Sequence, residues 1–457
     1  MQIAMTKPLF AWDEIEDSPS LQTIKEFLQS VPDARLLASL RSRRGKGRND
    51  YPVTVLWGTL LLSIVLRHAT MEGCLGELRR NRGLRRLIGI EREEEVPKAW
   101  NISRFLELLG KEPHRTLLVK VFDEMVRRMA GEVGDLGLRV AGDATGLRGR
   151  AERSKAKRDK GEDGDELSEP TGGRKEYVGD SGRVERVVEW FGYKLHLLVD
   201  VKHEVVLAWR ITPANYADNA ALPKLLAQAR RNLPDGRMKS LAYDKACDDG
   251  EIHELLDEAG IEPVIENRSL WKEEKEYILP GHDGSSNIVY DEMGTVYCYD
   301  KASNPPVRHA MQYIGHEPKR RTLKYRCPAM YAGWKCPSHA RCNQGKKYGK
   351  TVRVKRDIDL RRFPPIPRAT KQFERLYKGR SAVERVNARI KILCGPDDGN
   401  IVGARRFFAM IGAVMVVHLG LATLLAAAPR YDVTLGKVRL TAIAKALRAK
   451  AGLKIAT

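Results

Sequence analysis

The stretch that decides the fold is LGLRVAGDATG at residues 136–146, a short strand-like run that ends on an acid and a turn. Two more strand candidates follow at 190–201 and 205–212, and only three residues separate them. A turn this short joins antiparallel neighbours. The sequence therefore predicts that a β-hairpin follows the strand at 136–146.

Downstream of the hairpin, helices alternate with strands. A helix is expected at 218–230 with Asp218 at its start, then the strand SLAY at 240–243, a helix at 250–259 and the strand EPVIE at 262–266. Strands joined through a helix pair in parallel. This order predicts an α/β fold with a five-stranded mixed sheet and helices on its faces.

Two aspartates are expected to meet in this sheet. Asp143 lies in or at the end of the first strand, and Asp244 directly follows the fourth. These two strands are neighbours at the point where the connections leave in opposite directions, which is where ligand sites collect. Carboxylates a few ångströms apart repel each other, and a divalent cation between them removes that repulsion.

A third acid is found by helix geometry. At about 100° per residue, Tyr377, Arg380, Glu384 and Lys391 share one stripe about 60° wide on a helix that begins near residue 371. The stripe presents a carboxylate flanked by two cations, which suits a metal and a phosphate. An ordinary amphipathic helix with Arg380 paired to Glu384 is the alternative interpretation.

These residues resemble a known family. Tyr377-x2-Arg380-x3-Glu384-x6-Lys391 is similar to the Y-R-E-K signature of bacterial insertion-sequence DDE transposases. Gly142-Asp143-Ala144-Thr145 and Leu241-Ala242-Tyr243-Asp244-Lys245 resemble the motifs around the first two acids of that family, although Cys247 stands where relatives usually carry an aromatic residue. The resemblance covers most of residues 35–425.

The resemblance implies an RNase H-like core with Asp143, Asp244 and Glu384 as catalytic metal ligands. It implies two Mg²⁺ (or Mn²⁺) ions per active site and phosphate contacts from Tyr377, Arg380 and Lys391. A protein of this kind binds the terminal inverted repeats of its element, hydrolyses a phosphodiester, and joins the freed 3′-OH to target DNA. Its expected partners are double-stranded DNA and, in the synaptic complex, a second copy of the chain.

Composition agrees with a nucleic-acid partner. The 457 residues carry 80 Lys and Arg against 59 Asp and Glu, a net charge of +21, and 42% are hydrophobic. Such an excess points to a polyanion, with a merely solubilising surface as the alternative. The odd number of cysteines, seven, indicates a reducing compartment, and the resemblance implies the cytoplasm of a bacterium, in association with the nucleoid.

The chain is expected to divide into consecutive regions. These are a helical, DNA-binding N-terminal domain, the first part of the core with a polar loop at 149–187, a β-rich insertion, the last part of the core with the glutamate helix, and a basic tail; their limits are 1–135, 136–266, 267–365, 366–430 and 431–457.

The insertion contains possible zinc ligands, since Cys327-x8-Cys336-x2-His339-x2-Cys342 supplies three thiols and an imidazole. The x8 gap is wider than usual, Cys298, His309 and His316 compete, and reduced cysteines are the alternative to a structural Zn²⁺.

Three other functions are weighed against the transposase. They are an element-end DNA-binding protein without chemistry, an RNase H-like nuclease that cuts without joining, and a membrane protein anchored by the uncharged segment 407–429. The three acids argue against the first, and a buried core helix explains the last segment better than a membrane span. No membrane is therefore expected among the partners.

Overall fold

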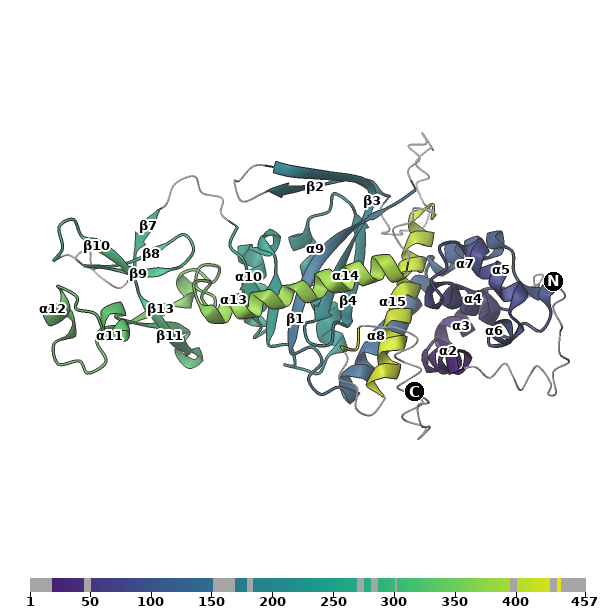
Figure 1. Ribbon diagram of the computed structural model, residues 1–457, viewed down its shortest axis with the longest axis horizontal. Coiled ribbons are helices and arrows are strands. Elements are labelled where there is room, and N and C mark those ends of the chain that lie inside the picture. Colours follow the sequence, from purple (N-terminus) through teal and green to yellow (C-terminus); the bar gives the residue numbers. More distant parts are fainter. Residues whose placement is uncertain are drawn as a thin grey trace, which may run out of the picture.

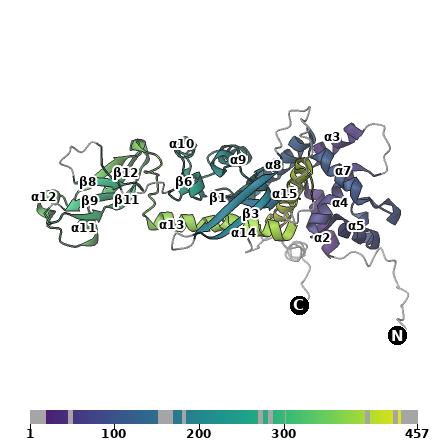
Figure 2. The ribbon, with the colours of Figure 1, turned by 90° about the horizontal axis from the view of Figure 1, so that it is seen from above.

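A computed structural model of the protein describes residues 19–44, 51–150, 169–178, 184–268, 275–280, 287–300, 302–394, 401–427 and 434–436. The molecule is elongated, with a helical N-terminal part at one end, a central sheet, and a β-rich part at the other end (Figures 1 and 2). The basic tail expected at 431–457 lies outside the described residues except for 434–436.

The N-terminal part is all-helical, as its hydrophobic periodicity predicts. Its α4 is apolar nearly all round because almost every residue in it is buried. The elements are α2 (Pro19–Ser30), α3 (Ala34–Arg44), α4 (Val53–Val65), α5 (Met71–Arg80), α6 (Arg82–Arg86), η1 (Glu93–Glu95), α7 (Ala99–Leu109) and α8 (His114–Glu132).

Helix α15 (Ala404–Ala426) joins this helical part to the central sheet. It packs against α8, α7, α4 and α2, and it also touches the sheet (Figure 1). Among the described residues it is the one helix long and apolar enough to cross a membrane, and most of it is buried inside the protein. Its composition is that of a core helix packed on both sides.

The central sheet is mixed, as predicted. Its strands are β1 (Arg139–Arg148), β2 (Thr171–Val178), β3 (Val184–Asp200), β4 (Val206–Pro213), β5 (Ser240–Tyr243) and β6 (Glu262–Ile265). The order is β2-β3-β1-β5-β6, with β4 also paired to β3. β3 is antiparallel to β1 and β4, whereas β1, β5 and β6 run parallel. The first and fourth predicted strands are thus neighbours.

The prediction of a polar loop at 149–187 is wrong in part. Residues 171–178 form β2, which pairs with the first half of β3 and makes a long hairpin that projects beyond the sheet (Figure 1). Both faces of this hairpin tip are largely exposed, so its sequence carries no apolar alternation from which a strand could be predicted. Residues 151–168 and 179–183 of the expected loop lie outside the described residues.

The prediction of one continuous helix from residue 371 is also wrong in detail. It is divided into α13 (Lys371–Tyr377), the 3₁₀ turn η5 (Lys378–Arg380) and α14 (Ser381–Cys394). Gly379 lies at the break, and a Cβ atom there would approach Val201 to 3.0 Å. Glycine both weakens the helix and allows this close approach. The remaining helices of the sheet region are α9 (Asp218–Asn232), η2 (Lys245–Cys247) and α10 (Gly250–Glu258).

The insertion is β-rich, as expected, and has its own small core that includes Leu279, Ile288, Leu323 and Phe363. One sheet has the order β10-β9-β8-β7 and another β11-β12-β13. The elements are β7 (Glu276–Ile278), β8 (Ile288–Asp291), β9 (Val296–Asp300), β10 (Val307–Ala310), β11 (Gln312–Glu317), η3 (Pro318–Arg320), β12 (Thr322–Arg326), α11 (Pro328–Ala332), α12 (His339–Asn343), β13 (Thr351–Lys355) and η4 (Arg356–Ile358).

Candidate active site

The register of the parallel pair β1–β5 brings the first two acids to the same level. Ala141 is paired with Ala242, and each acid follows two residues later on its own chain, Asp143 on β1 and Asp244 after β5. Since side chains repeat their direction every second residue of a strand, both carboxylates leave the same face of the sheet. The structure therefore brings Asp143 and Asp244 together at one level of the sheet.

Gly142 allows the backbone to pack closely beside the two acids. A Cβ atom on Gly142 would lie 2.2 Å from the Tyr243 ring and 2.8 Å from Leu198. Tyr243 is fully buried beneath this point. Glycine before the first acid and a large aromatic residue before the second therefore form one packing unit under the site.

Asp143 and Asp244 line a cavity of about 330 Å³ that also contains a third aspartate, Asp218, at the start of α9. Five cations share its wall and come from β1, the β2–β3 hairpin and α14: Arg148, Arg174, Lys175, Lys194 and Lys391. A small acidic centre enclosed by basic side chains is the arrangement that a phosphodiester with a metal-bound phosphate requires.

The environment raises the pKa of both acids. Burial raises the pKa of Asp143 to about 6; the charge of Asp244 adds to this rise, while Lys175 and Arg380 oppose it. Burial also raises the pKa of Asp244, against a hydrogen bond of 3.0 Å that its Oδ1 accepts from the Ala246 amide. Burial therefore destabilises the charged form of both carboxylates, and a bound cation would offset this effect.

Glu384 lies on the first turn of α14, and its Oε1 accepts a hydrogen bond of 2.6 Å from Arg380. Its side chain is 52% exposed, and Glu384 is not among the residues that line the cavity. Arg380 is close enough to lower the pKa of Asp143 and Asp244 as well. One guanidinium therefore faces all three predicted acids.

The other two signature residues point to different partners. Lys391 lines the cavity and donates a hydrogen bond of 2.6 Å to the Gly146 carbonyl on β1. Tyr377 donates a hydrogen bond of 2.9 Å to Glu266 after β6, and its ring lies near the Arg380 guanidinium. Tyr377 thus fixes α13 to the sheet. The 3₁₀ turn η5 separates Tyr377 from α14, so Tyr377 does not share the predicted stripe with Glu384 and Lys391.

The donor set fits a divalent cation in part. Asp143 and Asp244 offer hard oxygen ligands of the kind that Mg²⁺ and Mn²⁺ prefer. Within the part of the chain that the structure describes, no group of three or more His, Cys, Asp or Glu side chains is arranged to hold a metal. The glutamate would have to rotate away from Arg380 to join the two aspartates.

Sequence reasoning missed several residues of the cavity. Lys175 and Arg174 lie in the stretch expected to be a loop, and Lys194 lies on β3, where it donates a hydrogen bond of 3.1 Å to Asp218. For Arg174 and Lys175 the signal was the basic character of the polar segment, and for Lys194 it was the motif Tyr193-Lys194-Leu195-His196, which resembles the stretch between the first two acids of the family. Cys247, the departure from the family pattern, is buried, and burial raises the pKa of its thiol so that it stays neutral.

The structure does not support the predicted zinc ligands Cys327, Cys336, His339 and Cys342, all of which it describes. His339 begins α12 and is exposed, and its Nε2 lies 3.1 Å from the Met330 sulfur. Cys298 is instead the fourth cysteine of a cavity of about 20 Å³ that Cys327, Cys336 and Cys342 also line, and burial raises the pKa of Cys298 to about 11. Free cysteines are the better description.

Comparison with known proteins gives two family matches. Residues 140–419 match the family described as "Transposase DDE domain", and residues 12–108 match the family described as "Transposase domain (DUF772)". The first of these matches covers more than half of the chain. No curated protein matches.

Among solved structures, the chain is similar to the cryo-EM structure of a piggyBac transposase synaptic complex with hairpin DNA. The two are 10% identical, with a TM-score of 0.34, over 97% of this chain and 84% of that chain.

Proposed function

The chain belongs to the DDE transposases of bacterial insertion sequences, and from this premise we propose that it cuts the ends of its own element and joins them to target DNA. Members of this family bind DNA and generally depend on divalent metals. The observation that carries the proposal is the register that puts Asp143 and Asp244 level on adjacent parallel strands, above a cavity walled by cations.

The strand order supports an RNase H-like core. If the projecting strand β2 is set aside, the sheet has the order β4-β3-β1-β5-β6, in which three antiparallel strands are extended by two parallel ones. This is the arrangement that the predicted five-stranded layout requires. The acids then lie at the switch point of the sheet, where α/β folds collect their ligands.

Each residue of the cavity has a chemical role in this proposal. Asp143, Asp244 and Glu384 would hold the Mg²⁺ or Mn²⁺ ions, two per site, which supply a lowered pKa for the attacking water and charge neutralisation at the phosphate. Lys391 and Lys175 both line the cavity and would bind the non-bridging oxygens of phosphates. Arg380 balances the acids and contacts the phosphate of the DNA end.

Recognition of the terminal inverted repeats is assigned to the helical N-terminal part. The stretch from α5 to α6 carries Arg79, Arg80, Arg82, Arg85 and Arg86. Basic helices position a protein on DNA through phosphate contacts. Joining two element ends at once requires two copies of the chain, so a homodimer on DNA is part of the proposal.

A cleavage assay tests the proposal. The substrate is a duplex that carries the inverted repeat found in the DNA flanking the gene, with Mg²⁺, and wild type is compared with Asp143→Asn. We expect a nick at the element end and a strand-transfer product from wild type only. Binding without cleavage would favour the end-binding protein, and cleavage without joined product would favour the nuclease.

Point variants test the N-terminal assignment better than a deletion does, because deletion would uncover α15. Arg80→Ala with Arg82→Ala should weaken binding to the repeat, measured by fluorescence anisotropy. Unchanged binding would refute this assignment alone and leave the chemistry untouched.

A further inference from the structure

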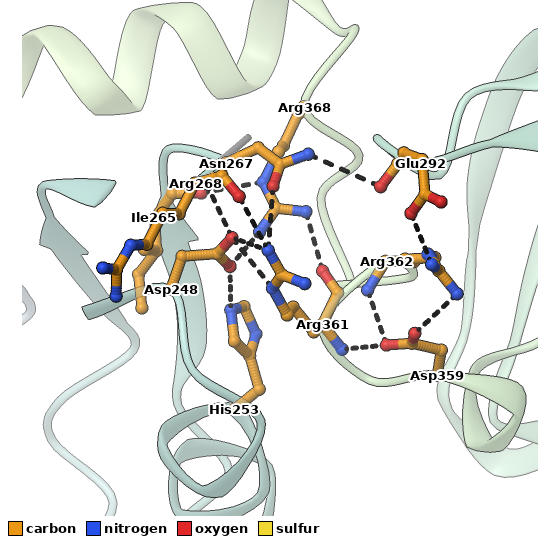
Figure 3. A network of polar contacts seen from close by, with 10 residues as sticks. All are labelled: Asp248, His253, Ile265, Asn267, Arg268, Glu292, Asp359, Arg361, Arg362 and Arg368. Carbon is orange, nitrogen blue, oxygen red and sulfur yellow. Dashed lines mark hydrogen bonds and ion pairs between the residues drawn. The ribbon is translucent and has the colours of Figure 1, made fainter. Parts of the chain in front are cut away.

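A buried carboxylate outside the cavity lies four residues after Asp244. The Asp248 side chain has no solvent exposure, and it accepts hydrogen bonds on both of its oxygens. Oδ1 receives Arg368 at 2.8 Å and lies 3.1 Å from His253 Nε2; Oδ2 receives the Arg268 amide at 2.8 Å and Arg361 at 2.9 Å. Figure 3 shows this carboxylate at the centre of the network.

The partners of Asp248 come from both ends of the insertion. Arg268 lies where the chain leaves the core after β6, and Arg361 and Arg368 lie where it returns toward α13. The two ends are also tied to each other, since Arg368 donates to the Ile265 carbonyl at 2.9 Å and Arg361 donates to the Arg268 carbonyl at 3.0 Å. One carboxylate therefore closes the junction of the insertion with the core.

Opposite charges stabilise this junction. Burial alone would raise the pKa of Asp248, but the bonds from His253 and Arg361 and the charge of Arg368 outweigh it and lower the pKa to about 2. A buried charge that loses one of its partners is strongly destabilised, so the loss of any one contact to Asp248 weakens the whole junction.

The junction leads directly into the elements that bear the signature residues. Arg368 is followed after two residues by α13, which packs on β5 and β6, and then by the turn with Arg380 and the helix with Glu384. On the other side, Asp248 follows Asp244 through the single turn η2. The same carboxylate thus holds the chain on both sides of the candidate active site.

We infer that Asp248 is a positioning residue of the transposase: it sets where Arg380 and Glu384 stand relative to Asp143 and Asp244, and it couples the insertion to the active site. The inference rests on the proposed function. It assigns no contact with DNA or metal to Asp248 itself.

The chain offers a matched control in Asp257 on α10. Asp257 also joins the core to the insertion through two arginines, with Arg356 at 2.8 Å and Arg321 at 2.9 Å. Those arginines belong to the body of the insertion, beside β12 and β13, and not to the segment that enters α13. Loss of Asp257 therefore weakens the attachment of the insertion without releasing the glutamate helix.

The first measurement does not depend on activity. Hydrogen–deuterium exchange is followed in peptides covering residues 369–384 of the full-length protein, without DNA or metal, for wild type, Asp248→Asn and Asp257→Asn. We expect faster exchange in this segment for Asp248→Asn only. Equal exchange in the two variants would overturn the inference.

The second measurement separates positioning from general stability. In the cleavage assay, Asp248→Asn should lower kcat between about 10-fold and 10²-fold, as expected when reacting groups are misplaced by about 1 Å. KM for the DNA should stay within about twofold, and Asp257→Asn should keep wild-type kcat. An unchanged kcat for Asp248→Asn would also refute the inference.

Two safeguards keep the test decisive. Thermal unfolding is measured for every variant, and if Asp248→Asn does not fold, Arg361→Lys replaces it, because Arg361 is partly exposed and lysine loses its forked contacts. If wild type does not cleave DNA at all, the proposed function fails, while the exchange experiment still decides whether Asp248 holds α13.

Discussion

Arg380 donates a hydrogen bond of 2.6 Å to Glu384 one helical turn away, and the same guanidinium lowers the pKa of Asp143 and Asp244. The positive charge of Arg380 reduces the repulsion between Glu384 and the two aspartates. In return, Glu384 and the two aspartates raise the pKa of Arg380 against the opposing effect of burial. The arginine is therefore part of the electrostatic balance of the site, in addition to its proposed contact with a phosphate.

Removal of the third carboxylate should abolish chemistry and spare binding. Glu384→Gln keeps the size of the side chain and a weaker bond to Arg380, and we expect cleavage to fall by at least about 10²-fold, as for other single losses from a catalytic set. Binding to the repeat, measured by anisotropy, should not weaken, because an anionic side chain makes no favourable contact with DNA phosphates. Glu374→Gln on the exposed face of α13 is the control, and a cleavage loss equal to that of Glu384→Gln would count against the assignment.

Lys391 should contribute a phosphate contact. Lys391→Ala should weaken DNA binding for all sequences alike and reduce the slope of log K against log salt by about 1. Lys378, which is exposed and paired with Glu374, is the control, and Lys378→Ala should leave the slope unchanged. If Lys391→Ala binds with a wild-type slope, its role is confined to the hydrogen bond with Gly146.

Gly142 should tolerate no side chain. Gly142→Ala forces a Cβ atom into the Tyr243 ring, and overpacking of this kind costs about 1–3 kcal/mol of unfolding free energy. Gly131→Ala in α8 meets nothing within 4 Å and should be neutral or stabilising by up to about 1 kcal/mol. Chemical denaturation measures both, and similar values for the two variants would disprove the packing argument.

Stability should decrease as the pH falls below about 6.5. Burial lowers the pKa of His196 and of His418 to about 4, so between these values the unfolded chain binds protons that the folded chain does not. These two histidines make stability rise with pH across this window, by at most about 3 kcal/mol each, while Asp143, with its pKa raised to about 6, contributes a change of opposite sign. The readout is the thermal midpoint at pH 7, 6 and 5 and constant ionic strength.

His418→Gln isolates one of these two contributions. The His418 Nε2 accepts a hydrogen bond from the Val206 amide, and a glutamine oxygen can take that place without titrating. The stability of the variant should depend less on pH than that of wild type, because the contribution of His418 is gone. A slope equal to that of wild type would show that His418 titrates normally.

Much of the central sheet could be predicted from local patterns. The strands at 240–243 and 262–265 and the helix after Asp218 agree closely with the expected ranges, because each buries one face and its apolar spacing records that burial. The hairpin tip of β2 and β3 could not be predicted, since exposed strands are held by backbone pairing and leave no such record. The prediction of the zinc ligands was wrong because sequence spacing does not reveal where the His339 side chain points, and it faces the Met330 sulfur.

The sequence by itself determined the family, the mixed sheet and the adjacency of Asp143 and Asp244, because these follow from strand order and from motifs within a few residues of one another. Only the tertiary structure decided that Lys175 and Lys194 enter the cavity, that Tyr377 is bound to Glu266, and that Asp248 joins both ends of the insertion to the core. These contacts link residues far apart along the chain, and their energies depend on burial and on the full set of neighbours, which no local pattern encodes.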